Sequence, residues 1–267
     1  TGKWMLTVYG MDAAVLEGLA SMAAIAANGT AMAAVAGNAL LMHAITNSET
    51  AMQAISRSQT AMQRIANSTT AMDAISGSKI ARGAVQASPY YNSYIKENDM
   101  AIAKLVVSFA NLASAGYSGM AGVAADAAMT AVAASSTAMT AVVASSTAMT
   151  AVAASATAMG KIAAVDAALS KLAASTTAMD ALYARKKQMK GGSASKSGKF
   201  IILEISQSNA FNTSKYGYAT LSDGSKPDWS SYLAKYAFFQ KYPKYATYML
   251  NDTDSDDYIY YFDIASP

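Results

Sequence analysis

The residues best suited to bind a metal ion lie near the C-terminus. Asp252, Asp254 and Asp256 occupy every second position, a spacing that offers carboxylate oxygens to a hard cation such as Ca²⁺. The run lacks the glycine and the distal glutamate of an EF-hand loop. We therefore expect a solvated hairpin turn in NDTDSDD and no cofactor, with Ca²⁺ as the weaker alternative for these three carboxylates.

Residues that could carry catalysis are scarce. The chain has no cysteine and a single histidine, His43. Without a cysteine or a second histidine, the usual nucleophile–base pairs and transition-metal sites cannot be assembled. The segment GGSASKSGK lacks the spacing of a phosphate-binding loop. His43 stands at a variable, solvent-facing position of a repeat, where a lone histidine is incidental. We expect no enzymatic activity.

Aromatic side chains that could contact a ligand concentrate at the C-terminal end. Ten of the 16 tyrosines lie in residues 199–267, with Trp229 and many Asp, Asn and Ser residues. Aromatic rings stack on the apolar faces of sugars, and tyrosine gives contact area at low entropic cost. The alternatives are that these rings form the core of a small domain or mediate self-association. The residues predicted to contact a cell-surface glycan or protein are Trp229, Tyr232, Tyr236, Tyr258 and Tyr260.

A ten-residue repeat makes up most of the remaining chain. In the register A-M-x-A-[V/I/L]-x-x-S-x-T, one array covers residues 21–88 and a second covers residues 119–187. On a helix, the residues at positions one, two, four, five and eight share one face. The bulky residues at positions two and five should therefore form the core. The predicted repeat core includes Met52, Ile55, Met62, Ile65, Met139, Val142, Met149 and Val152.

The same repeat predicts a series of short helices. Ten residues advance about 1000° along a helix, so the apolar stripe of one continuous helix would slip by about 80° per repeat. Threonine at position ten is a good N-cap. We predict a solenoid of capped helices of six or seven residues; the alternatives are a trimeric helical coiled coil and a disordered tract. The predicted caps are Thr50, Thr60, Thr70, Thr137, Thr147 and Thr177.

The segments outside the arrays differ from them in composition. Residues 1–20 are predicted to cap the first array, and residues 89–118 to form a non-repeat insertion with one helix. Residues 188–198 are predicted to be a basic Gly/Ser linker. Residues 199–267 are predicted to form a small α+β or β-sandwich domain, because apolar and polar residues alternate there. In its first strand, KFIILEIS, the alternation places Phe200, Ile202 and Glu204 on one face.

Charge and hydropathy exclude two classes of partner. The net charge is +3 and the basic residues are scattered rather than clustered, which is not typical of a nucleic-acid-binding face. No apolar run approaches the ~20 residues that span a bilayer, because Ser, Thr and Asn interrupt every repeat. We therefore expect neither nucleic-acid binding nor membrane insertion. The first residues lack an initiator Met, so we expect a fragment or a processed product.

The repeats resemble those of a known group of proteins. Runs such as SSTAMTAVVASSTAM, followed by the basic GGSASKSGK and a Tyr-rich terminal domain, resemble the Ala/Met-rich decapeptide-repeat tail fibres of tailed bacteriophages. The resemblance implies a structural protein of the virion that acts outside the host cell and displays a receptor-binding tip. It also implies a homo-oligomer, with a trimer favoured, and other virion proteins as partners.

Two other kinds of protein fit the same sequence. A cellular surface adhesin or a self-assembling extracellular filament subunit would also join a repeat array to an aromatic terminal domain. A third hypothesis, ice binding, rests on the rows of Ser and Thr at positions eight to ten. All three hypotheses assign the repeats a structural role, because a solenoid provides a regular exposed surface rather than a catalytic cleft.

Overall fold

The structure is a computed structural model that describes residue 19 and residues 21–206, 217–229, 233–252 and 257–267. The chain divides into two compact units, Thr1–Val123 and Ala124–Pro267. Both units contain short helices, and the second also contains a C-terminal antiparallel sheet. The prediction of a mainly helical chain with a small C-terminal β-containing domain is confirmed. The predicted cap at residues 1–20 lies outside the described residues except for Leu19.

In the first unit, each ten-residue repeat forms one helix. Those of α4 to α9 have eight or nine residues, longer than the six or seven predicted from sequence. The helices are α3 (Met22–Ala27), α4 (Gly29–Gly37), α5 (Ala39–Thr46), α6 (Glu49–Ser56), α7 (Gln59–Ala66), α8 (Thr69–Gly77) and α9 (Lys79–Gln86).

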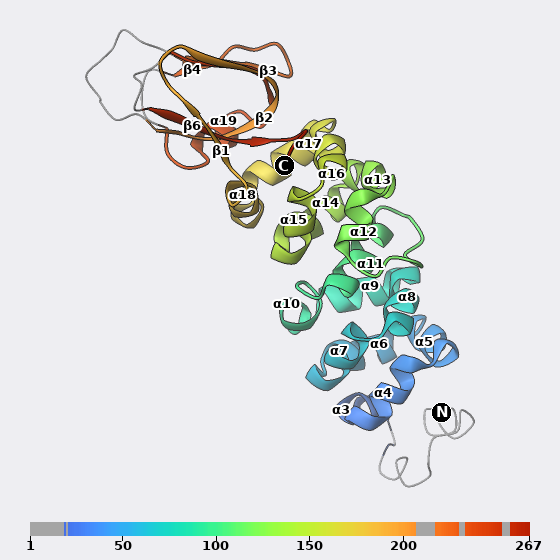
Figure 1. The fold of residues 1–267 in the computed structure, drawn as a ribbon. Coiled ribbons are helices and arrows are strands. Elements are labelled where there is room, and N and C mark those ends of the chain that lie inside the picture. Colours follow the sequence, from blue (N-terminus) through green and yellow to red (C-terminus); the bar gives the residue numbers. More distant parts are fainter. Residues whose placement is uncertain (1–18, 20, 207–216, 230–232, 253–256) are drawn as a thin grey trace. The chain divides into compact units, whose positions relative to one another are not determined.

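These helices stack in layers of three. Each helix packs on the helix three places further along the chain: α3 on α6, α4 on α7, α5 on α8 and α6 on α9 (Figure 1). The chain turns sharply between consecutive helices, by 98° between α4 and α5. Three repeats therefore complete one layer, and residues about 30 apart in sequence become neighbours.

The core of the stack consists of the bulky residues at positions two and five. Met52, Ile55, Met62 and Ile65 are all fully buried. Alanine at position one, as in Ala61, is buried beside them. In the second unit, the residues expected in the core are buried to the same extent: Met139, Val142, Met149 and Val152. Small residues next to Met and Ile allow the short helices to approach closely.

The helix caps differ from the prediction. The prediction that threonine caps the helices is wrong for Thr50, Thr60, Thr70, Thr137, Thr147 and Thr177, each of which is the second residue of its helix. The cap is the serine two residues earlier. Ser68, for example, accepts a hydrogen bond from the backbone N–H of Ala71 at 3.1 Å. Serine caps at least as well as threonine, so starting each helix two residues earlier loses nothing at the cap.

The capping serine also joins one layer to the next. The Ser68 hydroxyl donates to the backbone carbonyl of Ala36, 32 residues earlier, at 2.6 Å. We call this contact the serine clasp. The same clasp joins Ser58 to Ala26, Ser78 to Thr46 and Ser88 to Ser56 in the first unit, and Ser155 to Ala124 and Ser175 to Val143 in the second. One hydroxyl thus satisfies an orphan amide and an orphan carbonyl.

The segment predicted as an insertion, residues 89–118, begins by continuing the repeat. Helix α10 (Tyr91–Tyr94) packs on α7, and α11 (Asp99–Phe109) packs on α8. Ile95 and Leu105 are fully buried at the ten-residue spacing of position five. The order of stacking therefore continues to the end of α11. A loop follows, in which Asn111 and Gly116 have φ values of 59° and 93°.

The second unit repeats the same packing. Helix α12 (Met120–Ala125) contains the boundary between the units. Helix α13 packs on α16, α14 on α17 and α15 on α18. The helices of this array are α13 (Ala128–Ala134), α14 (Ser136–Ala144), α15 (Ser146–Ala153), α16 (Ala156–Ala163), α17 (Asp166–Ala174) and α18 (Thr176–Tyr183).

A six-stranded antiparallel sheet follows the second array. Its strands lie in the order β1-β6-β2-β5-β3-β4. A short helix, α19 (Ala237–Lys241), packs on β2 (Figure 1). The strands are β1 (Lys187–Lys190), β2 (Ala194–Ser206), β3 (Gly217–Leu221), β4 (Asp228–Trp229), β5 (Ala246–Asn251) and β6 (Tyr258–Asp263).

Residues 188–198 form strands, so the prediction of a linker there is wrong. They contain most of β1 and the first part of β2. The first part of β2 pairs with β5 and the second part with β6, and the register shifts between Ser197 and Phe200. Gly198 lies in this shift with φ 158°, and the Phe200 ring covers the place where a side chain would stand. The glycine therefore allows a bend within one long strand.

The sheet domain contacts the last helices of the second array. Helix α19 contacts α17, and β6 contacts α18. An ion pair joins Lys244, which precedes β5, to Asp166 at the start of α17. The open end of a repeat stack must be covered, because its core would otherwise face water. The sheet domain provides this cover within the second unit.

Candidate functional site

Trp229 is a core residue rather than a surface contact. Its side chain is 4% exposed, and its ring meets Phe238 edge to face at 5.7 Å between centroids. The ring also lies against Gly217, where any side chain would collide with the indole. The prediction that Trp229 contacts a receptor is therefore wrong, because a small domain needs its largest ring for its own core. Tyr232 lies outside the described residues.

Tyr236 joins the sheet domain to the second array. Its side chain is buried, its φ of 72° places it in the left-handed region before α19, and its hydroxyl donates to the carboxylate of Asp180 in α18. Lys235 forms an ion pair with the same carboxylate at 3.1 Å. The hydrogen bond from Tyr236 and that from Lys235 lower the pKa of Asp180. Tyr236 is therefore unsuited to contact a receptor.

A second contact in the seam between α18 and the sheet domain involves Tyr183, the last residue of α18. Its hydroxyl donates to the Glu204 carboxylate of β2 at 2.5 Å, and its ring meets that of Tyr236 edge to face at 5.7 Å. Burial, together with the hydrogen bond to Glu204, raises the pKa of Tyr183 to about 12. The repeat pattern did not predict that Tyr183 would join α18 to the sheet. The only signal is a large ring at position six, where Ala133, Ala153 and other repeats have a small residue.

Tyr258 and Tyr260 form an aromatic pair on one face of the sheet. Both are half-buried on β6, while Ile259 between them is buried on the opposite face. Their rings are stacked, with centroids 6.2 Å apart and planes 20° from parallel. Directly opposed residues of paired strands share a face. Tyr260 therefore lies between Gln188 and Glu204, and Tyr258 between Lys190 and Ser206.

These six residues are called the tyrosine platform: two rings on the middle strand, with an amide and an ammonium group on one side and a carboxylate and a hydroxyl on the other. Tyr183 and Lys186 adjoin it. The Tyr183 ring lies 6.4 Å from that of Tyr260, and the Lys186 ammonium lies 4.2 Å from the Tyr183 ring centroid and 5.8 Å from that of Tyr260. Aromatic faces beside several polar groups suit a ligand with both apolar and hydroxylated surfaces.

Glu204 belongs to the platform because of a β-bulge that the sequence did not reveal. The predicted alternation placed Glu204 on the face of Phe200 and Ile202. The register with β6 shifts between Ile202 and Glu204, so that Ile205 instead joins Phe200 and Ile202 in the core. The bulge adds one residue to β2 and turns Glu204 to the opposite face.

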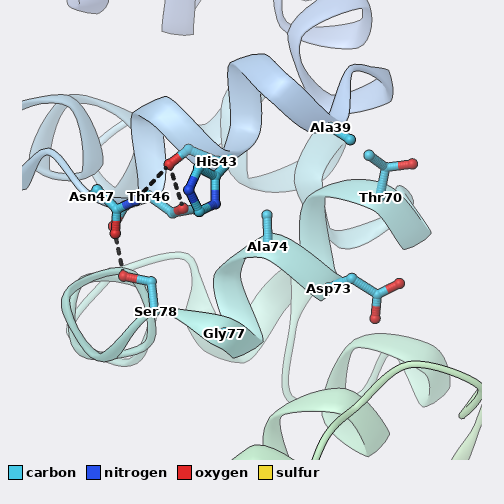
Figure 2. Close-up of a pocket in the computed structure, with 9 residues that line it drawn as sticks. All are labelled: Ala39, His43, Thr46, Asn47, Thr70, Asp73, Ala74, Gly77 and Ser78. Carbon is cyan, nitrogen blue, oxygen red and sulfur yellow. Dashed lines mark hydrogen bonds between the residues drawn. The ribbon is translucent and has the colours of Figure 1, made fainter.

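His43 lines a shallow hollow between α5 and α8 in the first unit. The hollow has a volume of about 480 Å³ and is also lined by Asn47, Thr70 and Asp73. Figure 2 shows these side chains. The polar groups there serve the helices themselves. Thr46 and Asn47 donate to the His43 carbonyl, and Asp73 accepts from the buried ammonium of Lys104 at 2.5 Å.

Similar hollows lie between α4 and α7, α6 and α9, and α3 and α6. All four hollows lie between helices of adjacent layers in the first unit, so the hollow at His43 is not unique to that histidine. It assembles no nucleophile with a base, and we assign it no catalytic role.

The acidic turn can be described only in part. Asp252 accepts a hydrogen bond from Ser193, and Asp257 is buried. Asp254 and Asp256, which with Asp252 were the candidate ligands in the weaker, Ca²⁺-binding alternative, lie outside the described residues. Among the residues that the structure does describe, no three His, Asp or Glu side chains are grouped as metal ligands.

No protein-family model matches the chain, and comparison with curated proteins finds no similar sequence. Within the described part of the chain, no single helix is both long and apolar enough to cross a membrane. The geometry of the chain itself is therefore the basis for a functional proposal.

Proposed function

We propose that this chain is a structural protein of the tail-fibre type, in which a helical solenoid carries a C-terminal domain that binds a glycan or protein on the host cell surface. The observation that carries the proposal is the tyrosine platform, a half-buried aromatic pair flanked by four polar residues. The resemblance of the repeats to those of phage tail fibres supports a place in the virion, outside the host cell, as a homo-oligomer.

The solenoid is inferred from the way in which the layers repeat. Helices of eight or nine residues, turns of about a right angle and serine clasps 32 residues apart all favour a chain that winds once per three repeats. A coiled coil needs longer helices with one continuous apolar seam. These short helices contact only their neighbours along the chain and in adjacent layers, which is typical of a repeat protein.

The chemistry of the platform favours a sugar over a purely apolar ligand. The ring faces of Tyr258 and Tyr260 can cover the C–H face of a sugar ring, and Gln188, Ser206 and Glu204 can donate to or accept from its hydroxyls. Rigid rings on a strand lose little conformational entropy when a ligand binds.

Binding by the full chain to host cells tests this proposal. We expect Tyr258→Ala/Tyr260→Ala to reduce binding at least tenfold, because the stacking surface is removed. The matched control is Tyr218→Ala/Tyr248→Ala, which removes another half-buried tyrosine pair of the sheet, with rings 5.7 Å apart. Far-ultraviolet circular dichroism and thermal unfolding establish that each variant is folded.

Two outcomes would contradict the proposal. Equal binding by the wild type and the Tyr258/Tyr260 variant would exclude the platform as the contact surface. Assembly of the wild type into filaments without cell binding would assign the chain to scaffolding. The mass of the chain in solution, measured in the same preparation, tests the expected homo-oligomer.

A further inference from the structure

Two lysines bring positive charge to the tyrosine platform: Lys190, which belongs to it, and Lys186, which adjoins it. Lys190 lies directly opposite Tyr258 on β1, and Lys186 lies over the rings of Tyr183 and Tyr260. Both lysine side chains are exposed. An ammonium group beside an aromatic face is held in place by the ring while its remaining donors stay open to solvent.

Three carboxylates of the sheet domain and α18 are already paired with other groups. Glu204 accepts from Tyr183, Asp180 pairs with Lys235, and Asp263 pairs with Lys187. Among the residues that the structure describes, neither Lys186 nor Lys190 forms an ion pair. Among the described residues, these two lysines therefore have no carboxylate partner.

We propose that the tyrosine platform binds an acidic sugar, a glycan unit bearing a carboxylate or sulfate, whose ring stacks on Tyr258 and Tyr260 while its anionic group pairs with Lys186 or Lys190. This inference rests on the function proposed above and names the class of glycan. The positive charge of the two lysines would select acidic sugars over neutral ones. A neutral sugar can use the rings and hydroxyl contacts, but only an acidic sugar pairs with the ammonium groups.

Two pairs of matched polysaccharides test the inference with the full chain. Polygalacturonate is compared with its methyl ester, and dextran sulfate with dextran, so that only the anionic group differs within each pair. We expect the wild type to bind at least one acidic member tenfold more tightly than its neutral partner. The pair that shows the preference identifies carboxylate or sulfate. The affinity should fall as salt concentration rises, because ions screen the pairing.

Two sets of variants separate the charge from the rings. Lys186→Gln/Lys190→Gln should reduce the preference for the acidic member from tenfold to less than about twofold, because it removes the two ammonium groups that pair with the anion. The matched control, Lys226→Gln/Lys241→Gln, removes the same charge from exposed lysines elsewhere in the domain, one of which also lies over a ring, that of Tyr242. Tyr258→Ala/Tyr260→Ala should weaken binding of both members of a pair.

The outcomes distinguish this inference from the proposed function. Equal affinity for acidic and neutral members, with binding still dependent on Tyr258 and Tyr260, would overturn the acidic class but keep a glycan-binding platform. A preference that survives in the Lys186/Lys190 variant would also overturn it. Acidic binding that is unchanged in the Tyr258/Tyr260 variant would reflect general charge attraction and overturn both.

Discussion

At the scale of single residues, the serine at position eight has two roles in repeats such as that of Ser68. Its oxygen accepts from an amide in the first turn of its own helix, and its hydroxyl hydrogen goes to a carbonyl in the preceding layer. Threonine at position ten has neither role. The ten-residue spacing alone did not distinguish the two residues, because both are good N-caps and lie two positions apart.

The two roles of Ser68 predict a specific order of stabilities. Ser68→Ala should lower the free energy of unfolding by about 2 kcal/mol, about 1 for the cap and about 1 for the interlayer bond. Ser68→Asp keeps the cap but cannot donate to Ala36, so its free energy of unfolding should lie between those of the wild type and Ser68→Ala. Thr70→Ala should change stability by less than about 0.5 kcal/mol. Urea unfolding measures all three; a cost at Thr70 equal to that at Ser68 would contradict this assignment.

Several site residues could not be predicted because their roles depend on packing across the fold. Trp229 and Tyr260 both belong to an aromatic-rich sequence, yet one is in the core and the other on the surface. Which ring turns inward depends on strand pairing, and that pairing includes bulges that alternation does not reveal. Met62 and Ile65 were easier to predict, because their spacing alone places them on one helical face.

At the scale of elements, the seam between α18 and the sheet is held by polar groups with shifted pKa values. Tyr183 has a pKa near 12 in the folded protein and near 10 when unfolded. The folded state therefore holds this proton more tightly. The stability contributed by the Tyr183–Glu204 bond is present below pH 10 and is lost as the pH rises from 10 to 12.

Replacing Tyr183 with phenylalanine tests this pH dependence. Between pH 10 and 12, the thermal midpoint of the wild type should fall more steeply than that of Tyr183→Phe, because the variant lacks this titrating group. The difference between the two curves isolates Tyr183 from the other tyrosines and lysines. Tyr248→Phe, on the opposite part of the sheet, serves as the control. Parallel curves for the wild type and Tyr183→Phe would contradict the assigned pKa.

At the scale of the whole molecule, the layers make the array modular in steps of three repeats. Deleting Glu49–Ser78 removes 30 residues and joins Ser48 to Lys79, so that Ser88 again has a carbonyl 32 positions before it, that of Ala26. We expect this variant to keep its helical content per residue and a cooperative unfolding transition, because its layers stay complete.

A deletion of similar size that breaks the period provides the comparison. Removing Ala54–Ser78 takes out 25 residues and joins Gln53, at position three of its repeat, to Lys79, at position nine of another. The core positions before the junction no longer face those of the layer after it. We therefore expect a fall in thermal midpoint of more than about 10 °C or a loss of cooperativity. Circular dichroism against temperature measures both variants. Equal behaviour would show that the layers do not depend on the ten-residue period.

The serine clasp also has a mechanical consequence. Each layer is about 9 Å high, the usual distance between packed helices, yet contains 30 residues that span ~100 Å when fully extended. One layer that opens under tension therefore lengthens the chain about tenfold over that segment. Each layer is joined only to its neighbours, by serine clasps and by the shared apolar core, so we expect layers to open one after another under tension. Under the function proposed above, this reserve of length would absorb a sudden pull on a bound cell before the contact with its surface breaks.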